Sequence, residues 1–295
     1  MRQRTLKTQA SIMGWLFITP ILLGTIVFSF TPVLYSLIIS FTEWNVVSPA
    51  KFIGLENFRL ILGGDIYFVQ AVRNTIVYCL GSIFFCIFFG LMLALLANQK
   101  IMGQNFYRTA FFAPSVTSTI AIGIVWTFIY EPNMGLLNSV LYTMDIQGPD
   151  WLGNSQFALM SVIIVQVWSQ SGYNMVIYLA GLQGIPKSYY ESATIDGANG
   201  FHQFWHITLP MLSPTTFFLM ITSFIGSFQV FNLVYVMTEG GPGYATTVYI
   251  QYLYIRAFEH YRMGYASAMA WVLFVVIGLI TVFQWKMQKR WVHYQ

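Results

Sequence analysis

The sequence predicts an all-α membrane protein with six transmembrane helices in one domain, residues 1–295. Of its 295 residues, 57% are hydrophobic and only 8% are charged, and the mean hydropathy is +0.63. A soluble globular domain has about 25% charged residues. Apolar stretches of about 20 residues or more, the length that crosses a bilayer, recur along the whole chain, and the scattered basic residues flank them. The net charge of +4 therefore reflects membrane topology rather than binding to nucleic acid.

The expected spans follow one another with short polar connections. Arg2, Arg4 and Lys7 precede the first apolar stretch, which is too long for a signal peptide and lacks a clear small-residue cleavage site. We expect it to be retained as a span, with Pro20 and Pro32 tolerated as kinks or ends. No internal repeat or low-complexity segment interrupts the chain. The six spans are expected near residues 12–41, 71–97, 109–130, 157–181, 210–237 and 265–286.

The basic residues orient these spans. With the N-terminus inside, nine Lys and Arg residues are cytoplasmic and five are outside, as the positive-inside rule requires. Both termini and the 185–210 connection are then cytoplasmic. The inner residues are Arg2, Arg4, Lys7, Lys100, Arg108, Lys187, Lys286, Lys289 and Arg290, and the outer ones are Lys51, Arg59, Arg73, Arg256 and Arg262.

The polar connection between the fourth and fifth spans has local signals for short helices. Ser188 and Glu191 match a capping box, which predicts a helix N-terminus. Gly197 suits a left-handed C-terminal cap, and Asn199 can cap a second helix that continues through His206. From these signals alone, a surface helix-turn-helix without a partner and a docking element are equally consistent with the sequence.

Catalytic chemistry is not indicated. No lysine follows a glycine, so the chain has no P-loop and cannot be its own P-loop ATPase. His202 and His206 have the i, i+4 spacing of metal ligands, but without further ligands nearby we expect a solvent-facing or docking surface. Cys79 and Cys86 would lie roughly 10 Å apart on one helix, too far for a disulfide, and are interpreted as small buried hydrophobes.

The 185–214 connection resembles the EAA loop of ABC importer permeases, with the pattern E-A-A-x3-G-x9-I-x-L-P. Ser192 replaces the usual middle alanine, a small-for-small change. Three outer turns, residues 52–58, 131–138 and 238–242, resemble F-x-G-L-x-N-F, N-P-x-x-G-L-L-N and T-x-G-G-P turns of sugar permeases. Besides Ser192 at the middle-alanine position, the residues that match the loop and its wider form in sugar permeases are Glu191, Ala193, Ile195, Asp196, Gly197, Ala198, Ile207, Thr208, Leu209 and Pro210.

The resemblance implies the type I ABC importer permease fold, in particular the first-named permease of a heterodimeric pair that imports a sugar or oligosaccharide by alternating access. Its implied partners are a second homologous permease, two cytoplasmic ATPase subunits and an extracytoplasmic solute-binding protein, in a bacterial inner membrane. ATP and Mg²⁺ belong to the ATPase partner, and no cofactor to this chain. The implied coupling residues are Tyr190, Glu191, Ser192, Ala193, Asp196, Gly197, Ala198, Leu209 and Pro210.

Polar residues within the spans predict a substrate path. In the fourth span, Gln166, Ser169, Gln170 and Tyr173 share one helical face, and Asn174 lies beside them. Hydroxyls and amides can bind sugar hydroxyls, although such residues also join membrane helices to each other. For most of these residues taken singly, joining helices is the stronger interpretation. For the stripe on the fourth span, a substrate path is favoured. Further candidates are Ser115, Ser118, Thr119 and Trp126 in the third span, and Ser223, Ser227, Gln229 and Asn232 in the fifth.

No Arg, Lys, Asp or Glu lies well inside a predicted span. An ion-coupled carrier usually needs intramembrane ionisable groups, and a strongly anionic substrate would also favour them, so a neutral carbohydrate fits best. Two alternatives stay open. One is the same fold importing a polyol or glycerol phosphate, and the other is a membrane channel or scaffold without ATP coupling.

Overall fold

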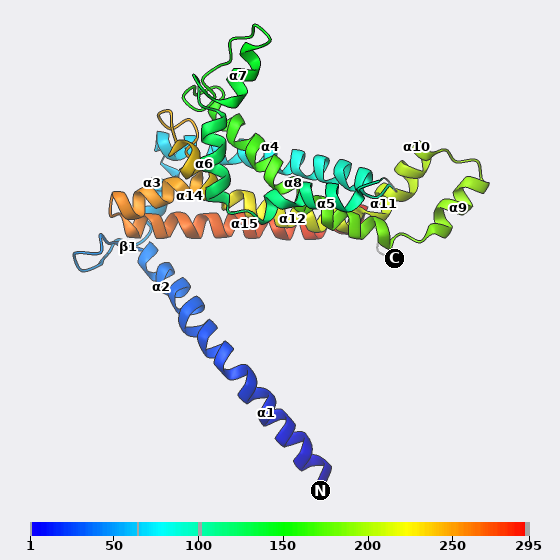
Figure 1. Ribbon diagram of the computed structural model, residues 1–295. Helices are drawn as coiled ribbons and strands as arrows, with labels where there is room; N and C mark the ends of the chain where they lie inside the picture. Colours follow the sequence, from blue (N-terminus) through cyan, green and yellow to red (C-terminus); the bar gives the residue numbers. More distant parts are fainter. Residues whose placement is uncertain (1, 64, 100–101, 293–295) are drawn as a thin grey trace. The chain divides into compact units, whose positions relative to one another are not determined.

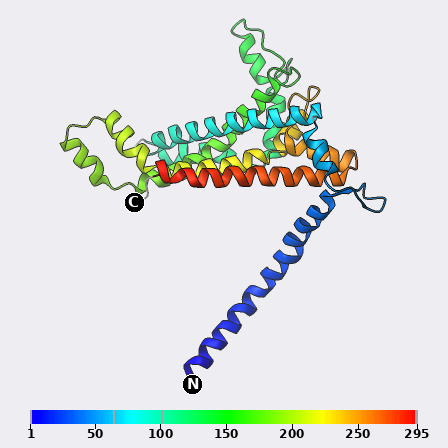
Figure 2. The ribbon, with the colours of Figure 1, turned by 180° about the vertical axis from the view of Figure 1, so that it is seen from behind.

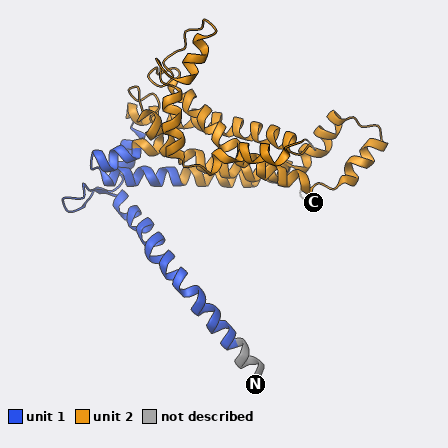
Figure 3. Cartoon of the chain, in the orientation of Figure 1, with its two compact units in different colours: residues 1–63, 253–274 blue, residues 64–252, 275–295 orange. Residues whose placement is uncertain are grey.

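The computed structural model describes residues 2–63, 65–99 and 102–292 (Figure 1). Lys100, which the charge distribution assigns to the cytoplasm, and the side chains of residues 2–7 lie outside the described part. The chain divides into two compact units, residues 1–63 with 253–274 and residues 64–252 with 275–295 (Figure 3). The predicted all-α class is confirmed, because the strands among the described residues are two short ones.

Unit 1 begins with one long helix and a small ribbon. The helix comprises α1 (Arg2–Thr25), a π-helical turn η1 (Ile26–Phe30) and α2 (Thr31–Ser40). Strands β1 (Thr42–Glu43) and β2 (Lys51–Phe52) pair antiparallel, with Thr42 opposite Phe52 and Glu43 opposite Lys51. Helix α3 (Glu56–Leu62) follows, and the unit is completed by η3 (Ile255–Glu259) and the first half of α15 (Met263–Trp291).

Unit 2 holds the remaining elements. Helices α4 and α8 lie side by side (Figures 1 and 2), and glycines permit their close approach. A Cβ on Gly90 of α4 would lie 2.5 Å from Asn174 Cβ of α8. The elements are α4 (Ile66–Ala97), α5 (Gln104–Val116), α6 (Thr119–Ile129), α7 (Leu136–Tyr142), α8 (Ala158–Gly184), α9 (Lys187–Ile195), α10 (Gly200–Gln203), η2 (Phe204–Thr208), α11 (Leu209–Met211), α12 (Ser213–Phe228), α13 (Asn232–Thr238) and α14 (Tyr249–Tyr254), the last reaching into residues of unit 1.

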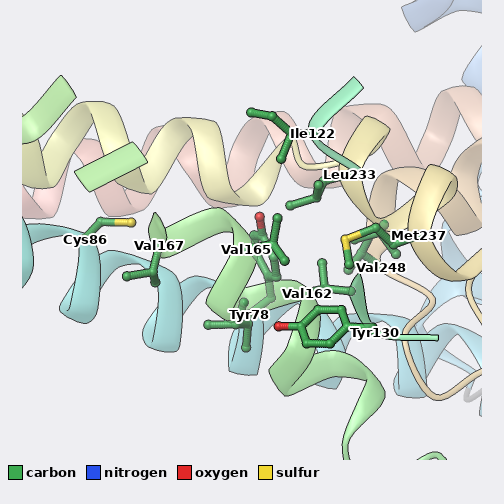
Figure 4. Close-up of a cluster of buried hydrophobic side chains, with 12 residues drawn as sticks. Tyr78, Cys86, Ile122, Tyr130, Val162, Val165, Val167, Leu233, Met237 and Val248 are labelled. Atoms are coloured by element: carbon green, nitrogen blue, oxygen red, sulfur yellow. The ribbon is translucent and has the colours of Figure 1, made fainter. Parts of the chain in front are cut away.

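Two clusters of buried hydrophobic side chains hold unit 2 together. The first, drawn in Figure 4, includes Tyr78 of α4, Val162 and Val165 of α8, and Leu233 of α13. The second lies along the other halves of α4 and α8 and against α12, and Tyr178 is fully buried in it. Cys79 and Cys86 are free and buried, as expected. The two clusters fix α4, α8 and α12 as the frame of this unit.

Fewer helices than expected are both long and apolar enough to be unbroken spans. Among the described residues these are Thr8–Ser40, Ile66–Ala97 and Met263–Trp291, and the number rises to five if two bent helix pairs each count as one span. Helix α8 has 27 residues, which is long enough to cross a bilayer, but its Gln, Ser and Asn residues keep it below the apolarity of these helices.

Two of the expected spans are not single straight helices, because the 109–130 and 210–237 stretches each contain more than one helix. In the 109–130 stretch, α5 and α6 meet at 100° because Thr117 and Ser118 have extended backbones, with ψ of 145° and 127°. The helix over 200–211 and α12 meet at 58°, at the start of the 210–237 stretch, where a separate helix before the span is expected. A second break separates α12 from α13.

Two prolines, Pro32 and Pro210, follow π-helical turns. The amide of Thr31, just before Pro32, donates to the Ile26 carbonyl, and the amide of Leu209, just before Pro210, donates to the Phe204 carbonyl. Proline has no N–H and its ring clashes with the carbonyl four residues earlier. The wider turn relieves that clash, so the helix continues through each proline.

Candidate functional site

The connection between α8 and α12 forms two helical arms joined by a tight turn. Gly197 has the predicted left-handed backbone, with φ +80°. The Ala198 amide donates to the Ala193 carbonyl at 2.8 Å, and the Gly197 amide donates to the Thr194 carbonyl at 3.1 Å. These two bonds are a Schellman motif, which ends α9 and turns the chain. Asn199 then caps α10 as expected, its side chain accepting from the His202 amide at 2.9 Å.

The prediction of a capping box at the start of the first arm is wrong. Helix α9 begins at Lys187 with Pro186 as its N-cap residue, and no side chain caps it. Proline fixes φ near −65° and suits the beginning of a helix. Ser188 therefore lies within the first turn, not at the extended position from which a hydroxyl reaches the free amides. The second arm is also longer than expected, since it continues through the π-helical turn to Met211.

The two arms enclose an open hollow of about 590 Å³. The Tyr190 and Thr208 hydroxyls lie 3.0 Å apart and tie α9 to η2. Beyond the hollow, apolar side chains are exposed, including Ile195 at 87% and Phe201 at 72%. Of the predicted coupling residues, Ser192, Ala193, Asp196 and Pro210 line the hollow, Glu191 and Gly197 are exposed, and Tyr190, Ala198 and Leu209 are half-buried.

His202 and His206 lie near this hollow with their rings stacked 5.0 Å apart. One ring nitrogen of His206 is 3.0 Å from the His202 carbonyl. Among the described residues no group of three His, Cys, Asp or Glu side chains could hold a metal ion. Both histidine side chains are exposed on the surface of the second arm.

A separate polar cavity of about 190 Å³ lies between α4, α8 and α12. The Ser82 and Ser227 hydroxyls, which both line it, form a hydrogen bond at 3.2 Å that joins α4 to α12. None of the side chains that line it is charged. They are Ser82, Ile83 and Cys86 of α4, Gln166, Gln170, Tyr173 and Asn174 of α8, and Thr222, Ser223, Gly226 and Ser227 of α12.

Asn174 is the most unusual residue of this cavity. Its side chain is 0% exposed, and neither its amide oxygen nor its amide nitrogen has a hydrogen-bond partner within the described residues. A buried unpaired polar group costs about 1–3 kcal/mol. An amide with both atoms unpaired in a polar cavity points to a bound ligand or water there.

The structure brings together part of the predicted path. Six predicted residues from the fourth and fifth spans line the cavity, namely Gln166, Gln170, Tyr173, Asn174, Ser223 and Ser227. Ser169 does not line it, and its hydroxyl donates to the Gln166 carbonyl at 3.1 Å. Ser115 donates to the Phe112 carbonyl at 2.7 Å. Ser118 and Thr119 are exposed at the 100° bend, Gln229 and Asn232 are exposed at the break after α12, and Trp126 contacts Trp168. Ser82 and Thr222 were not predicted.

The turn after α6 is organised by one carboxylate. Glu131 accepts hydrogen bonds from the backbone amides of Met134 and Asn133, the latter at 2.9 Å. These bonds, the one from Met134 first, hold the pKa of the Glu131 carboxyl below its ordinary value. This turn is one of the three that the sequence indicates outside the membrane.

The fold, the polar cavity and the two-armed connection fit a polytopic membrane permease. Residues 86–292 match the family of binding-protein-dependent transport system inner membrane components, and the chain belongs to this family. It is 39% identical over 289 residues to the probable ABC transporter permease protein YesP of Bacillus subtilis (strain 168), covering 97% of this chain and 93% of that protein.

Two further similarities bear on fold and substrate. The sn-glycerol-3-phosphate transport system permease protein UgpA of Agrobacterium fabrum is 32% identical over 285 residues, covering 96% of this chain and 97% of that protein. A chain of the bacterial alginate ABC transporter, solved with an alginate pentasaccharide-bound periplasmic protein, superposes with a TM-score of 0.85 at 21% identity over 96% of each chain. The last match shows that the two chains share their fold.

Proposed function

We propose that this chain is the permease subunit of an ABC importer for a neutral sugar or oligosaccharide. The observation that carries the proposal is the cavity between α4, α8 and α12, which is lined by amides and hydroxyls and by no charged group. Such groups match the donors and acceptors of a carbohydrate. The unpaired amide of Asn174 would find its partners on the substrate, so substrate binding would remove its desolvation cost.

Glycerol phosphate is the second candidate substrate, because UgpA of Agrobacterium fabrum is a relative over nearly its whole length. A phosphate monoester carries a charge of −1.5 to −2 at neutral pH and pairs with Arg or Lys. The cavity offers neither, which supports the neutral substrate. Binding assays of the co-purified solute-binding protein with sugars, polyols and glycerol 3-phosphate would decide between them, and selective binding of the phosphate ester would contradict our proposal.

The two-armed connection would couple transport to ATP. In this proposal α9 and its exposed apolar neighbours dock on a cytoplasmic ATPase subunit, Ala193 permits close approach, and Gly197 sets the turn. The complex contains two such ATPases, which bind ATP and Mg²⁺, a second homologous permease and an extracytoplasmic solute-binding protein. Both termini of this chain lie in the cytoplasm, in a bacterial inner membrane. ATP shifts the equilibrium between the inward-open and outward-open states only to the extent that it binds one state more tightly than the other.

Replacement of Glu191 tests this coupling. Glu191→Ala in the assembled complex is expected to abolish binding-protein-stimulated ATP hydrolysis and sugar uptake, while the amount of inserted protein stays the same. Ser188→Ala is the matched control, because Ser188 is exposed on the same helix and caps nothing. Normal uptake by the Glu191 variant would refute its role, and purification of the chain without any ATPase, even after crosslinking, would refute the importer assignment.

A further inference from the structure

In unit 1, the C-terminal end of α2 lies beside the N-terminal part of α15. The Trp271 indole of α15 donates to the Ser36 hydroxyl of α2 at 3.2 Å, and the Gly264 amide donates to the Trp44 carbonyl at 3.4 Å. A Cβ on Gly264 would lie 1.9 Å from the Thr42 carbonyl oxygen. Because one helix ends and the other begins at this contact, the ribbon and α3 of unit 1 lie at the level where both helices leave the bilayer.

A groove of about 500 Å³ opens at this level, between the ribbon, α3 and residues 260–265. Three aromatic side chains line it, those of Trp44, Tyr261 and Tyr265, and Trp and Tyr are enriched where membrane meets water. Tyr261 and Val46, next to the groove, have φ of +54° and +72°. These left-handed backbones are unfavourable for residues of this kind and persist where the surrounding structure enforces them, often at binding sites.

The groove presents charges of both signs. Glu43 and Lys51 are opposed in the ribbon but form no ion pair among the described residues. The Arg262 guanidinium lies 5.0 Å from the centre of the Tyr265 ring, which orients it at the groove wall. Glu56, also in the groove, is in a long 3.8 Å contact with Arg59, and His260 is 3.2 Å from Arg256. Glu43, Lys51 and Arg262 are therefore the groups without a charged partner.

An apolar surface continues from the groove along α2. The rings of Trp44 and Tyr35 are in edge-to-face contact, with centroids 6.5 Å apart. Leu34 and Ile38 on the same helix are exposed by 58% and 64%. Within unit 1, none of the most apolar 18-residue window of the helix Thr8–Ser40 is buried.

We propose that this groove binds the headgroup of a zwitterionic aminophospholipid. Arg262 and Lys51 bind the phosphate, Glu43 accepts from the primary ammonium, and an acyl chain lies along α2 beyond Tyr35. The bilayer level of the groove, its charges of both signs and its continuity with an apolar helix favour a lipid over a protein loop. The site is separate from the substrate cavity and from the two-armed connection, so it does not depend on the proposed substrate.

Lipid titration of the full chain tests the site. The chain, purified in detergent and delipidated, is titrated with phosphatidylethanolamine, phosphatidylcholine or phosphatidylglycerol in mixed micelles, and bound lipid is counted by native mass spectrometry. We expect tight retention of one phosphatidylethanolamine. Phosphatidylcholine, which lacks the N–H donors, and phosphatidylglycerol, which lacks the ammonium, should each bind at least about tenfold more weakly, the expected effect of losing a charge-assisted hydrogen bond.

Variants separate the two halves of the headgroup. Glu43→Gln should remove the preference for phosphatidylethanolamine over phosphatidylcholine, with Glu259→Gln as its control, because Glu259 is exposed and lies outside the groove. Arg262→Gln should weaken both lipids about tenfold or more, whereas Arg262→Lys should keep most of the binding. Arg59→Gln is the second control, since Arg59 does not line the groove.

Three results would overturn the proposal. Equal retention of the three lipids, or equal losses in Arg262→Gln and Arg59→Gln, would show that the groove selects no headgroup. Displacement by water-soluble glycerophosphoethanolamine at the same concentration would identify a site for a free zwitterion instead of a lipid. If the variants kept lipid but lost association with the solute-binding protein, the groove would be a protein-docking site. Thermal unfolding of each variant identifies any that is misfolded. If Arg262→Gln is misfolded, lipid retention by Arg262→Lys tests the role of the positive charge instead.

Discussion

Replacement of Asn174 by leucine distinguishes a substrate contact from a structural one. The side chain is fully buried with both amide atoms unpaired among the described residues, and it faces a cavity of about 190 Å³ that can accept the larger methyl groups. An unpaired buried polar group costs about 1–3 kcal/mol. Asn174→Leu should therefore leave the free energy of unfolding unchanged or raise it by up to about 2 kcal/mol, and yet reduce sugar uptake at least tenfold.

Ser171 supplies the matched control on the same helix. It is buried too, but its hydroxyl donates to the Val167 carbonyl at 2.6 Å and it does not line the polar cavity. Ser171→Ala should lower the free energy of unfolding by at most about 0.6 kcal/mol, the average for side-chain hydrogen bonds between membrane helices, with normal uptake. Denaturant unfolding in detergent and uptake per inserted complex measure the two effects. If Asn174→Leu were destabilised as Ser171→Ala is, or transported normally, the reasoning would be wrong.

Three further substitutions test the frame around the sites. Gly197→Ala should cost about 1–2 kcal/mol because of its left-handed backbone and lower ATPase stimulation, whereas Gly200→Ala, with equal space and no positive φ, should not. Gly172→Ala would place a Cβ 1.9 Å from a carbonyl oxygen of α5 and should destabilise the protein by about 1–3 kcal/mol or more, unlike Gly184→Ala in open space on the same helix. Because the pKa of Glu131 is lowered in the folded protein, its stabilisation of the turn is present above the ordinary value of 4.5 and lost as the pH falls through the folded pKa. Hydrogen exchange of the two capped amides should show this loss, and Glu131→Gln should remove it.

Local chemistry made part of the two-armed connection predictable. The left-handed turn at Gly197 and the cap at Asn199 depend on a few neighbouring residues, and both were read correctly from the sequence. Ser188 and Glu191 had the right spacing for a capping box, but with Pro186 as the N-cap the helix starts two residues earlier than that box requires. A motif that depends on the first residue of a helix fails when that residue is displaced, although the helix itself is present.

The breaks in the spans were not predictable from apolarity. A hydropathy window over 109–130 averages across Thr117 and Ser118, and neither Gly nor Pro occupies those two positions. Two residues with extended backbones are enough to turn the helix by 100°. Tertiary packing determines that turn, because α5 lies against α8 at Gly172 while α6 packs on α13 at Gly123. A single helix axis could not satisfy both contacts.

The polar cavity shows how far helical periodicity carries a prediction of function. Of the predicted stripe on the fourth span, Gln166, Gln170 and Tyr173 line the cavity and Ser169 does not, because one helical face repeats every three to four residues. Ser82 gave no such signal, since it is an isolated hydroxyl among the apolar residues 79–97 of α4, and it joins the cavity only because α4 packs against α8. Asn174 was placed beside the stripe, although its unpaired amide makes it the strongest candidate for a substrate contact. A periodic pattern thus identifies a polar face, whereas the unmet hydrogen-bonding capacity that indicates a ligand becomes visible only when the neighbouring helices are in place.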